Sequence, residues 1–243
     1  MFIDELLTYL FDEKPHILTE PMGTWLTSSR RFITFVDTFR DKIRKKIRVT
    51  QDQETLLDLR LELETAYLLF QEKNLTVTYE PQLAEKVRSP DFAVTYTTSL
   101  TFMVEVTRLR TSQKSVDGQT SPVNIGEQLA DAVCSKLGQL QSKQSNVLLV
   151  GVDTLHLTQE DIRAAMLRTQ QRVERNDPAF FQRYRFRDRA DFFRYYQRLS
   201  EILVRGTDSQ KGETFIAWVN PQAKYPLPSK VRTVLYRSQG SAG

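Results

Sequence analysis

The sequence is poor in the residues that form disulfides and zinc sites. Its 243 residues include 1 cysteine, Cys134, and 2 histidines, His16 and His156. A single cysteine excludes an internal disulfide and is typical of proteins kept in a reducing compartment, so we expect a cytoplasmic protein. With so few nitrogen and sulfur ligands, a structural zinc site is not expected. Any bound metal should be a hard cation held by carboxylates.

Long hydrophobic runs are also missing. The longest apolar run, VLLVGV at 147–152, has the length of a strand, whereas a bilayer-spanning helix needs roughly 20 residues. The opening MFIDELLTYLFDE carries acids inside its apolar stretch and has no basic leader, so a secretory signal is not expected. We therefore expect no membrane partner. The net charge of +4 permits a polyanionic partner but does not identify one.

The middle of the chain changes from helical to strand periodicity. The predicted elements run helix, strand, strand, strand, helix, strand, at 53–73, 75–81, 91–96, 101–109, 126–143 and 145–153. Three strands follow one another before a helix crosses over to a fourth. This order predicts an α/β fold with a mixed central sheet flanked by helices.

Helical additions are expected on both sides of this core. The predicted units are a helical extension packed on the core at 1–50, the α/β domain at 51–236 with a helical insertion at 158–206, and a disordered tail at 237–243. Within the extension, one apolar stripe predicts a continuous helix at 22–48. A last strand is expected at 213–220, where β-branched and aromatic residues return.

Two carboxylates lie on consecutive predicted strands. Asp91 follows Pro90 at the start of one strand, and Glu105 lies inside the next, TFMVEVTRL. An acid among apolar residues is costly to bury unless a cation pairs with it. Two carboxylates, a carbonyl and waters suit Mg²⁺ or Mn²⁺, so a metal site at these two acids is one interpretation. In the structural alternative, Glu105 pairs with Arg108 or Arg110 and Asp91 caps a turn.

The two flanking helices offer a third carboxylate and a lysine. Glu62 lies nearer the apolar stripe of its helix than Glu64, so Glu62 is the preferred third ligand and Glu64 should face water. On the next helix, Lys136 is centred on the apolar stripe and Gln139 borders the same face. Lys136 either extends along the helix edge into water or points into a carboxylate pocket, where it would stabilise developing charge.

Over 53–153, this order of residues resembles the restriction-endonuclease-like superfamily, the PD-(D/E)xK nucleases. The resemblance implies an α-β-β-β-α-β core that hydrolyses DNA or RNA with Mg²⁺ or Mn²⁺. Residue by residue, it implies that Asp91 and Glu105 are metal ligands and that Glu62 is an added one. In such a site all three acids are catalytic.

The family places a lysine two residues after the second acid, and this chain has Thr107 there. Some members carry that lysine on the following helix, and Lys136 suits this catalytic role, with Thr107 and Gln139 in support. The departure leaves a second interpretation open. In it the chain is a catalytically inactive nuclease-like module that binds nucleic acid or a protein partner.

The last third of the chain interleaves arginines with aromatic rings. Guanidinium groups bind phosphates and rings stack on bases, so nucleic acid is the expected partner. The candidate contacts are Arg183, Arg185, Phe186 and Arg187, together with Lys45 and Lys46 in DKIRKKIR. In the alternative, the rings are core side chains and the basic residues form solvated helix faces. A homo-oligomer remains open, as does the choice between DNA and RNA.

Overall fold

A computed structural model describes residues 3–50, 52–82, 89–110, 125–154, 157–208 and 212–240. The first half of the chain forms α1 (Ile3–Phe11), α2 (Thr19–Ser28), α3 (Arg30–Thr38), α4 (Arg40–Val49), α5 (Gln53–Gln71), β1 (Leu75–Tyr79), β2 (Phe92–Tyr96) and β3 (Leu100–Arg108). The second half forms α6 (Ile125–Leu137), β4 (Ser145–Thr154), α7 (Gln159–Glu174), α8 (Pro178–Tyr184), α9 (Arg189–Tyr196), β5 (Leu199–Asp208), β6 (Gly212–Val219) and α10 (Ser229–Gly240).

The described strands form one six-stranded sheet in the order β1-β2-β3-β4-β5-β6. Strands β1, β2 and β3 pair antiparallel, β4 lies parallel to both β3 and β5, and β6 returns antiparallel to β5. The parallel strand β4 is covered on both faces, which explains its near-continuous apolar sequence. The predicted α/β class with a mixed sheet is confirmed.

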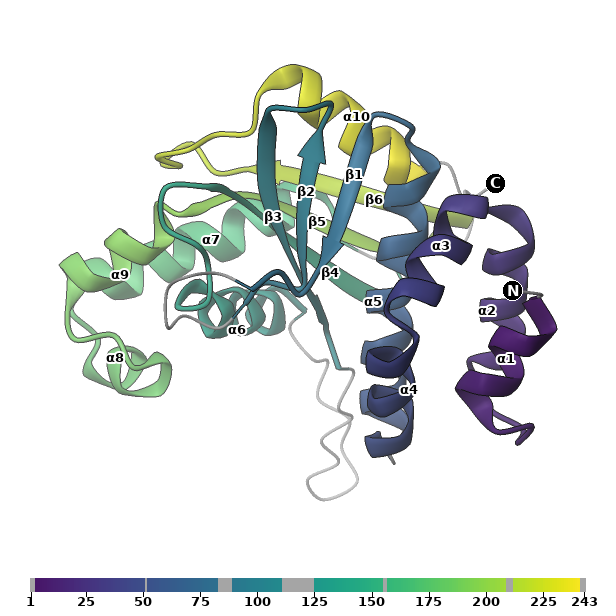
Figure 1. Cartoon of the computed structure of the whole chain (residues 1–243). Helices are drawn as coiled ribbons and strands as arrows, with labels where there is room; N and C mark the ends of the chain where they lie inside the picture. The colour runs from purple at the N-terminus through teal and green to yellow at the C-terminus, as the bar shows by residue number, and fades with distance from the viewer. Residues whose placement is uncertain are drawn as a thin grey trace.

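Each face of the sheet has its own hydrophobic core. Helices α1 to α5 and α10 share one core with side chains such as Phe102 and Val104 of β3. Helices α6 to α9 share the other core with Leu148 and Val150 of β4. Figure 1 shows these two groups of helices on opposite sides of the strands. Within the described residues, no helix is long and apolar enough to cross a membrane.

The N-terminal helices pack on the α/β core, and Arg31 links the two parts. Its guanidinium donates to the carbonyls of Phe70, at 2.9 Å, and Glu72, at 2.8 Å, and also to Leu75. These carbonyls lie at the end of α5 and the start of β1, where the helix leaves acceptors without helical partners. The predicted single helix at 22–48 is wrong, because Ser29 is extended and caps a new helix by accepting from the Phe32 amide.

Two predictions about the C-terminal part are also wrong. The insertion at 158–206 is helical only up to Tyr196, and from Leu199 the chain forms β5 between β4 and β6. The tail predicted as disordered from 237 continues α10 to Gly240, and Ser238 and Gln239 are buried. The predicted last strand is confirmed as β6. Residues 241–243 lie outside the described ranges.

Candidate functional site

Glu105 and Lys136 meet between β3 and α6. The Glu105 side chain projects from the α6 face of β3 and is 3% exposed. The Lys136 ammonium lies 2.7 Å from Glu105 Oε1 and 3.5 Å from Gln139 Oε1. Lys136 therefore points into the carboxylate pocket, as one of the two interpretations predicted. Lys136, and not Arg108 or Arg110, is therefore the ion-pair partner of Glu105.

Asp91 connects the start of β2 to β3. Its Oδ2 accepts a hydrogen bond from the Val106 amide, with 2.7 Å between nitrogen and oxygen. Removal from water, with the nearby charges of Glu105 and then Glu62, raises the pKa of Asp91 to about 7. Glu105 of β3 and Glu62 of α5 are thus both close enough to repel the carboxylate of Asp91 at the start of β2.

Glu62 reaches this pocket from α5 and is bound from the opposite side. Its Oε1 lies 2.6 Å from the Lys46 ammonium and accepts a hydrogen bond from the Tyr79 hydroxyl. Lys46 also lies 2.5 Å from Glu80, whose second oxygen is 2.5 Å from Lys42. Burial and the Glu62 charge raise the pKa of the Tyr79 hydroxyl, so Tyr79 remains a hydrogen-bond donor at neutral pH.

Lys46 is therefore part of the candidate site. Burial lowers its pKa, but the charges and hydrogen bonds of Glu62 and Glu80 outweigh this and raise the pKa overall. The prediction that Lys46 contacts nucleic acid does not fit this position, because its ammonium already lies between two carboxylates. Lys45, the neighbouring residue, is exposed and stays a candidate for such a contact.

A cavity of about 190 Å³ opens where these side chains meet, lined by Asp58, Glu62, Asp91, Val106, Thr107, Arg108 and Lys136. Its volume is several times the roughly 30 Å³ that one water occupies in the liquid. Thr107 lines this cavity together with Lys136. Glu105 does not line this cavity; its side chain is buried and contacts Lys136, which does line it.

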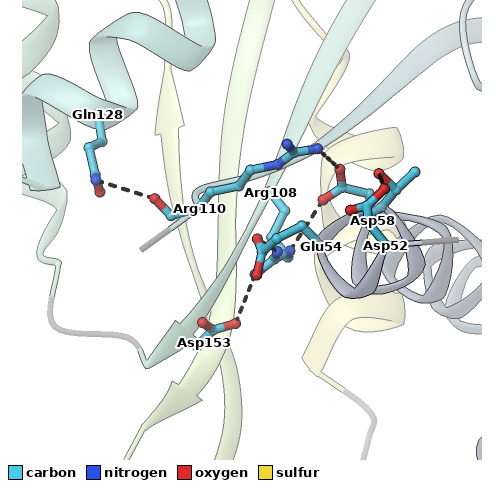
Figure 2. Close-up of polar contacts among 8 residues, drawn as sticks. Asp52, Glu54, Asp58, Arg108, Arg110, Gln128 and Asp153 are labelled. Atoms are coloured by element: carbon cyan, nitrogen blue, oxygen red, sulfur yellow. Dashed lines mark hydrogen bonds and ion pairs between the residues drawn. The ribbon is translucent and has the colours of Figure 1, made fainter. Parts of the chain in front are cut away.

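An arginine cluster neutralises the acids on the first turns of α5, as Figure 2 shows. The Arg108 side chain is 6% exposed and contacts Glu54, Asp58 at 3.2 Å and Asp153 at 3.4 Å. Arg110 binds the other Asp58 oxygen at 2.6 Å. Only the structural alternative paired Arg108 or Arg110 with Glu105, and that pairing is wrong, because strand spacing cannot show which helix carboxylates lie above the strand end.

Glu64 is a second correction on α5. It was expected to face water, but its Oε1 lies 3.0 Å from the buried Arg205 of β5. The preference for Glu62 over Glu64 agrees with the cavity lining, which includes Glu62 and not Glu64. Tyr79 and the role of Lys46 were missed. The one available sequence signal was the clustering of lysines at the end of α4.

The predicted nucleic-acid contacts of the last third differ in exposure. Phe186 is 7% exposed, stacks on Phe180 and meets Phe192 edge-to-face, so its ring belongs to the core and is not available to a base. Arg183 binds Asp131 at 2.5 Å, and Arg187 lies 3.5 Å from Asp191. Arg185, at a left-handed backbone position with a φ of 60°, is exposed.

The acids match a hard divalent cation in donor chemistry. Burial and, after it, the charges of Glu105 and Glu62 raise the pKa of Asp91, and a bound cation would offset both effects. Two of them already have lysine partners, Lys136 on Glu105 and Lys46 on Glu62. In the part of the chain that the structure describes, no three His, Cys, Asp or Glu side chains form a group that could hold a metal ion.

Comparison of the chain with known protein families, with curated proteins and with solved structures finds no match.

Proposed function

We propose that the chain is a metal-dependent nuclease that hydrolyses phosphodiester bonds of DNA or RNA in the cavity at Asp91. One observation carries this proposal. Asp91 is held beside Glu105 and Glu62 at a raised pKa of about 7, while an ammonium from α6 enters the same pocket. Carboxylates with perturbed pKa values that converge in a cavity are characteristic of functional sites.

Each residue has a role that follows from its position. Asp91 and Glu105 would hold Mg²⁺ or Mn²⁺, and Glu62 would add a contact directly or through water. When bound, such an ion polarises a phosphoryl oxygen and neutralises its charge. Lys136 lines the cavity and would stabilise the negative charge that builds up on the phosphate during attack. Thr107 can donate a hydrogen bond there but supplies no charge.

The test is a cleavage assay on DNA and RNA. Wild-type protein should cut DNA or RNA only with Mg²⁺ or Mn²⁺, and Asp91→Ala should abolish cutting. Asp37→Ala serves as a matched control, since Asp37 is a surface acid whose partner is Arg40 at 3.3 Å. Metal-dependent cutting that survives in Asp91→Ala would refute the assignment.

The pairing of the acids favours a second candidate function, a catalytically inactive module that binds nucleic acid or a protein. Lys136 and Lys46 occupy Glu105 and Glu62, and Thr107 stands where the resembling family has lysine. Calorimetry with Mn²⁺ separates the two. Heat with wild type and none with Glu105→Ala supports the enzyme. No heat with wild type, combined with salt-sensitive binding of nucleic acid, supports the module.

A further inference from the structure

A second hollow, of about 460 Å³, opens between α6, α7 and α8. It lies on the side of α6 away from the carboxylates, because Cys134 lines it whereas Lys136, two residues further along, points at Glu105. Small side chains leave the space open: Gly126, Ala130 and Cys134 on α6, and Ala165 and Thr169 on α7. The volume falls in the range of about 300–1,000 Å³ that is usual for small-molecule sites.

Three arginines line this hollow, together with the carboxylates of Glu127 and Asp131. Arg168 of α7 is exposed, and its charge helps to lower the pKa of Asp161 on the same helix. Arg172 lies 2.7 Å from Asp177 and above the ring of Phe180. Guanidinium groups are planar forks that bind phosphate oxygens in pairs.

The third arginine shows that the hollow already binds an anionic oxygen. Asp131 Oδ1 lies 2.5 Å from the Arg183 guanidinium and accepts from the Tyr184 hydroxyl at 2.7 Å. A carboxylate of the chain itself thus occupies the donors that an incoming anion would use. Arg183 is 63% exposed along its side chain, so it can turn from Asp131 to a ligand without leaving water.

We propose that this hollow binds the phosphate group of an organic ligand, with Arg168 as the principal contact and Arg183 shared between the ligand and Asp131. Two sources supply that chemistry. One is a free nucleotide, whose size suits the volume above the small side chains. The other is a nucleic-acid strand that continues from the cavity at Asp91. The second source rests on the proposed function, since α6, about 20 Å long, borders both places.

The experiment is calorimetric titration of the full chain with adenosine 5′-monophosphate in the presence of a chelator. A parallel titration uses a short single-stranded oligonucleotide without terminal phosphates. Wild type should bind one or both probes. Arg168→Ala should weaken binding about tenfold, as expected for loss of a charged hydrogen bond. The matched control is Arg163→Ala on the same helix, since Arg163 is 70% exposed, pairs with Glu160 at 3.7 Å and does not line the hollow.

A third variant has an effect of opposite sign. Asp131→Asn removes the internal anion that occupies Arg183 and Tyr184, so it should tighten phosphate binding. Absence of binding by wild type to both probes would overturn the proposal, as would an equal loss in Arg168→Ala and Arg163→Ala. Binding of the mononucleotide alone identifies a free phosphomonoester as the ligand, and binding of both identifies a strand. Because no divalent cation is present, failure here leaves the metal-dependent cutting at Asp91 to be judged separately.

Discussion

Replacement of Lys136 by methionine gives the sharpest test of the candidate site. The change keeps the length and the apolar part of the side chain and removes only the ammonium. Glu105, 3% exposed, then loses the partner that lies 2.7 Å away. Its carboxylate must stay charged without that partner or take up a proton, and both cost free energy of folding.

The size of this loss in folding free energy follows from the exposure of Glu105 and Lys136. Removal of one member of a buried ion pair costs about 3–5 kcal/mol, and the 18% exposure of the Lys136 side chain places this pair at about 3 kcal/mol. For a chain of this size, that lowers Tm by about 6–12 °C. Glu105→Gln should cost less, about 1 kcal/mol, because the Lys136 ammonium that remains can extend into water.

The assay is thermal and urea unfolding of Lys136→Met, of Glu105→Gln and of the variant that carries both changes, with and without Mn²⁺. If the acids bind a cation, Mn²⁺ replaces the missing ammonium and binds Lys136→Met more tightly than wild type. At a concentration of 100 times the Kd, the gain is about 2.7 kcal/mol, enough to offset most of the loss. Glu105→Gln should gain little, since one of the two principal ligands is gone.

Lys45→Met is the matched control, because Lys45 is an exposed helical lysine outside the cavity. The reasoning about Lys136 is refuted if Lys136→Met unfolds at the same temperature as Lys45→Met. The metal assignment is refuted if Mn²⁺ stabilises Glu105→Gln as much as it stabilises Lys136→Met.

Three further predictions concern the surroundings of the site. The raised pKa of Asp91, about 7 against an ordinary 3.8, means that the folded state holds an extra proton between these values. The free energy of unfolding should therefore fall as pH rises through that window. In urea unfolding at pH 5 and pH 8, Asp91→Asn should remove this fall. A variant that loses as much stability between the two pH values as wild type would contradict the prediction. Lys46→Met should destabilise the fold by about 1–3 kcal/mol, because Glu62 loses its cation. In thermal unfolding, Lys46→Arg should retain most of the wild-type stability, and an equal loss in both variants would show that charge is not the cause. Gly151→Ala places a Cβ 2.4 Å from a Leu61 methyl and should cost about 1–3 kcal/mol in urea unfolding; wild-type stability would show that Leu61 moves freely.

Local periodicity predicted the part of the fold that contains the candidate site. Strands β1 to β3 and β4 alternate or run apolar in ways that neighbouring residues alone determine. The orientation of Lys136 was one of two predicted outcomes for the same reason, since a helical wheel places it among apolar residues that must face the sheet. Its contact with Glu105 then follows from the docking of α6 on β3.

Strand β5 shows where such reasoning fails. Its sequence, LSEILVRG, carries two charges, Glu201 and Arg205, that are buried inside the sheet. Arg232 of α10 lies 2.5 Å from Glu201, and Glu64 of α5 lies 3.0 Å from Arg205. These partners are 31 and 141 residues away in sequence. The sequence alone therefore could not show that the two charges have buried partners, and such charges are typical of a solvated helix face.

The same limit applies to the network around Glu62. Lys46 and Tyr79 reach Glu62 because α4 lies beside α5 and β1 follows α5, and no spacing in the sequence encodes that packing. The extension at 1–50 therefore does more than cover a hydrophobic face, since one of its lysines sets the charge around the third acid.

The placement of the ammonium has a structural consequence for the candidate site. A lysine at 107 would be fixed by the register of β3, on the same strand as Glu105. Lys136 is fixed instead by α6, whose Leu129, Val133 and Leu137 pack into the core on that face of the sheet. The acids and the positive charge therefore belong to different layers of the fold, and the distance between them depends on how α6 docks. Because one face of α6 holds Lys136 against Glu105 and the other lines the arginine-rich hollow, a ligand in the hollow that shifts α6 would act directly on the charge at the acids.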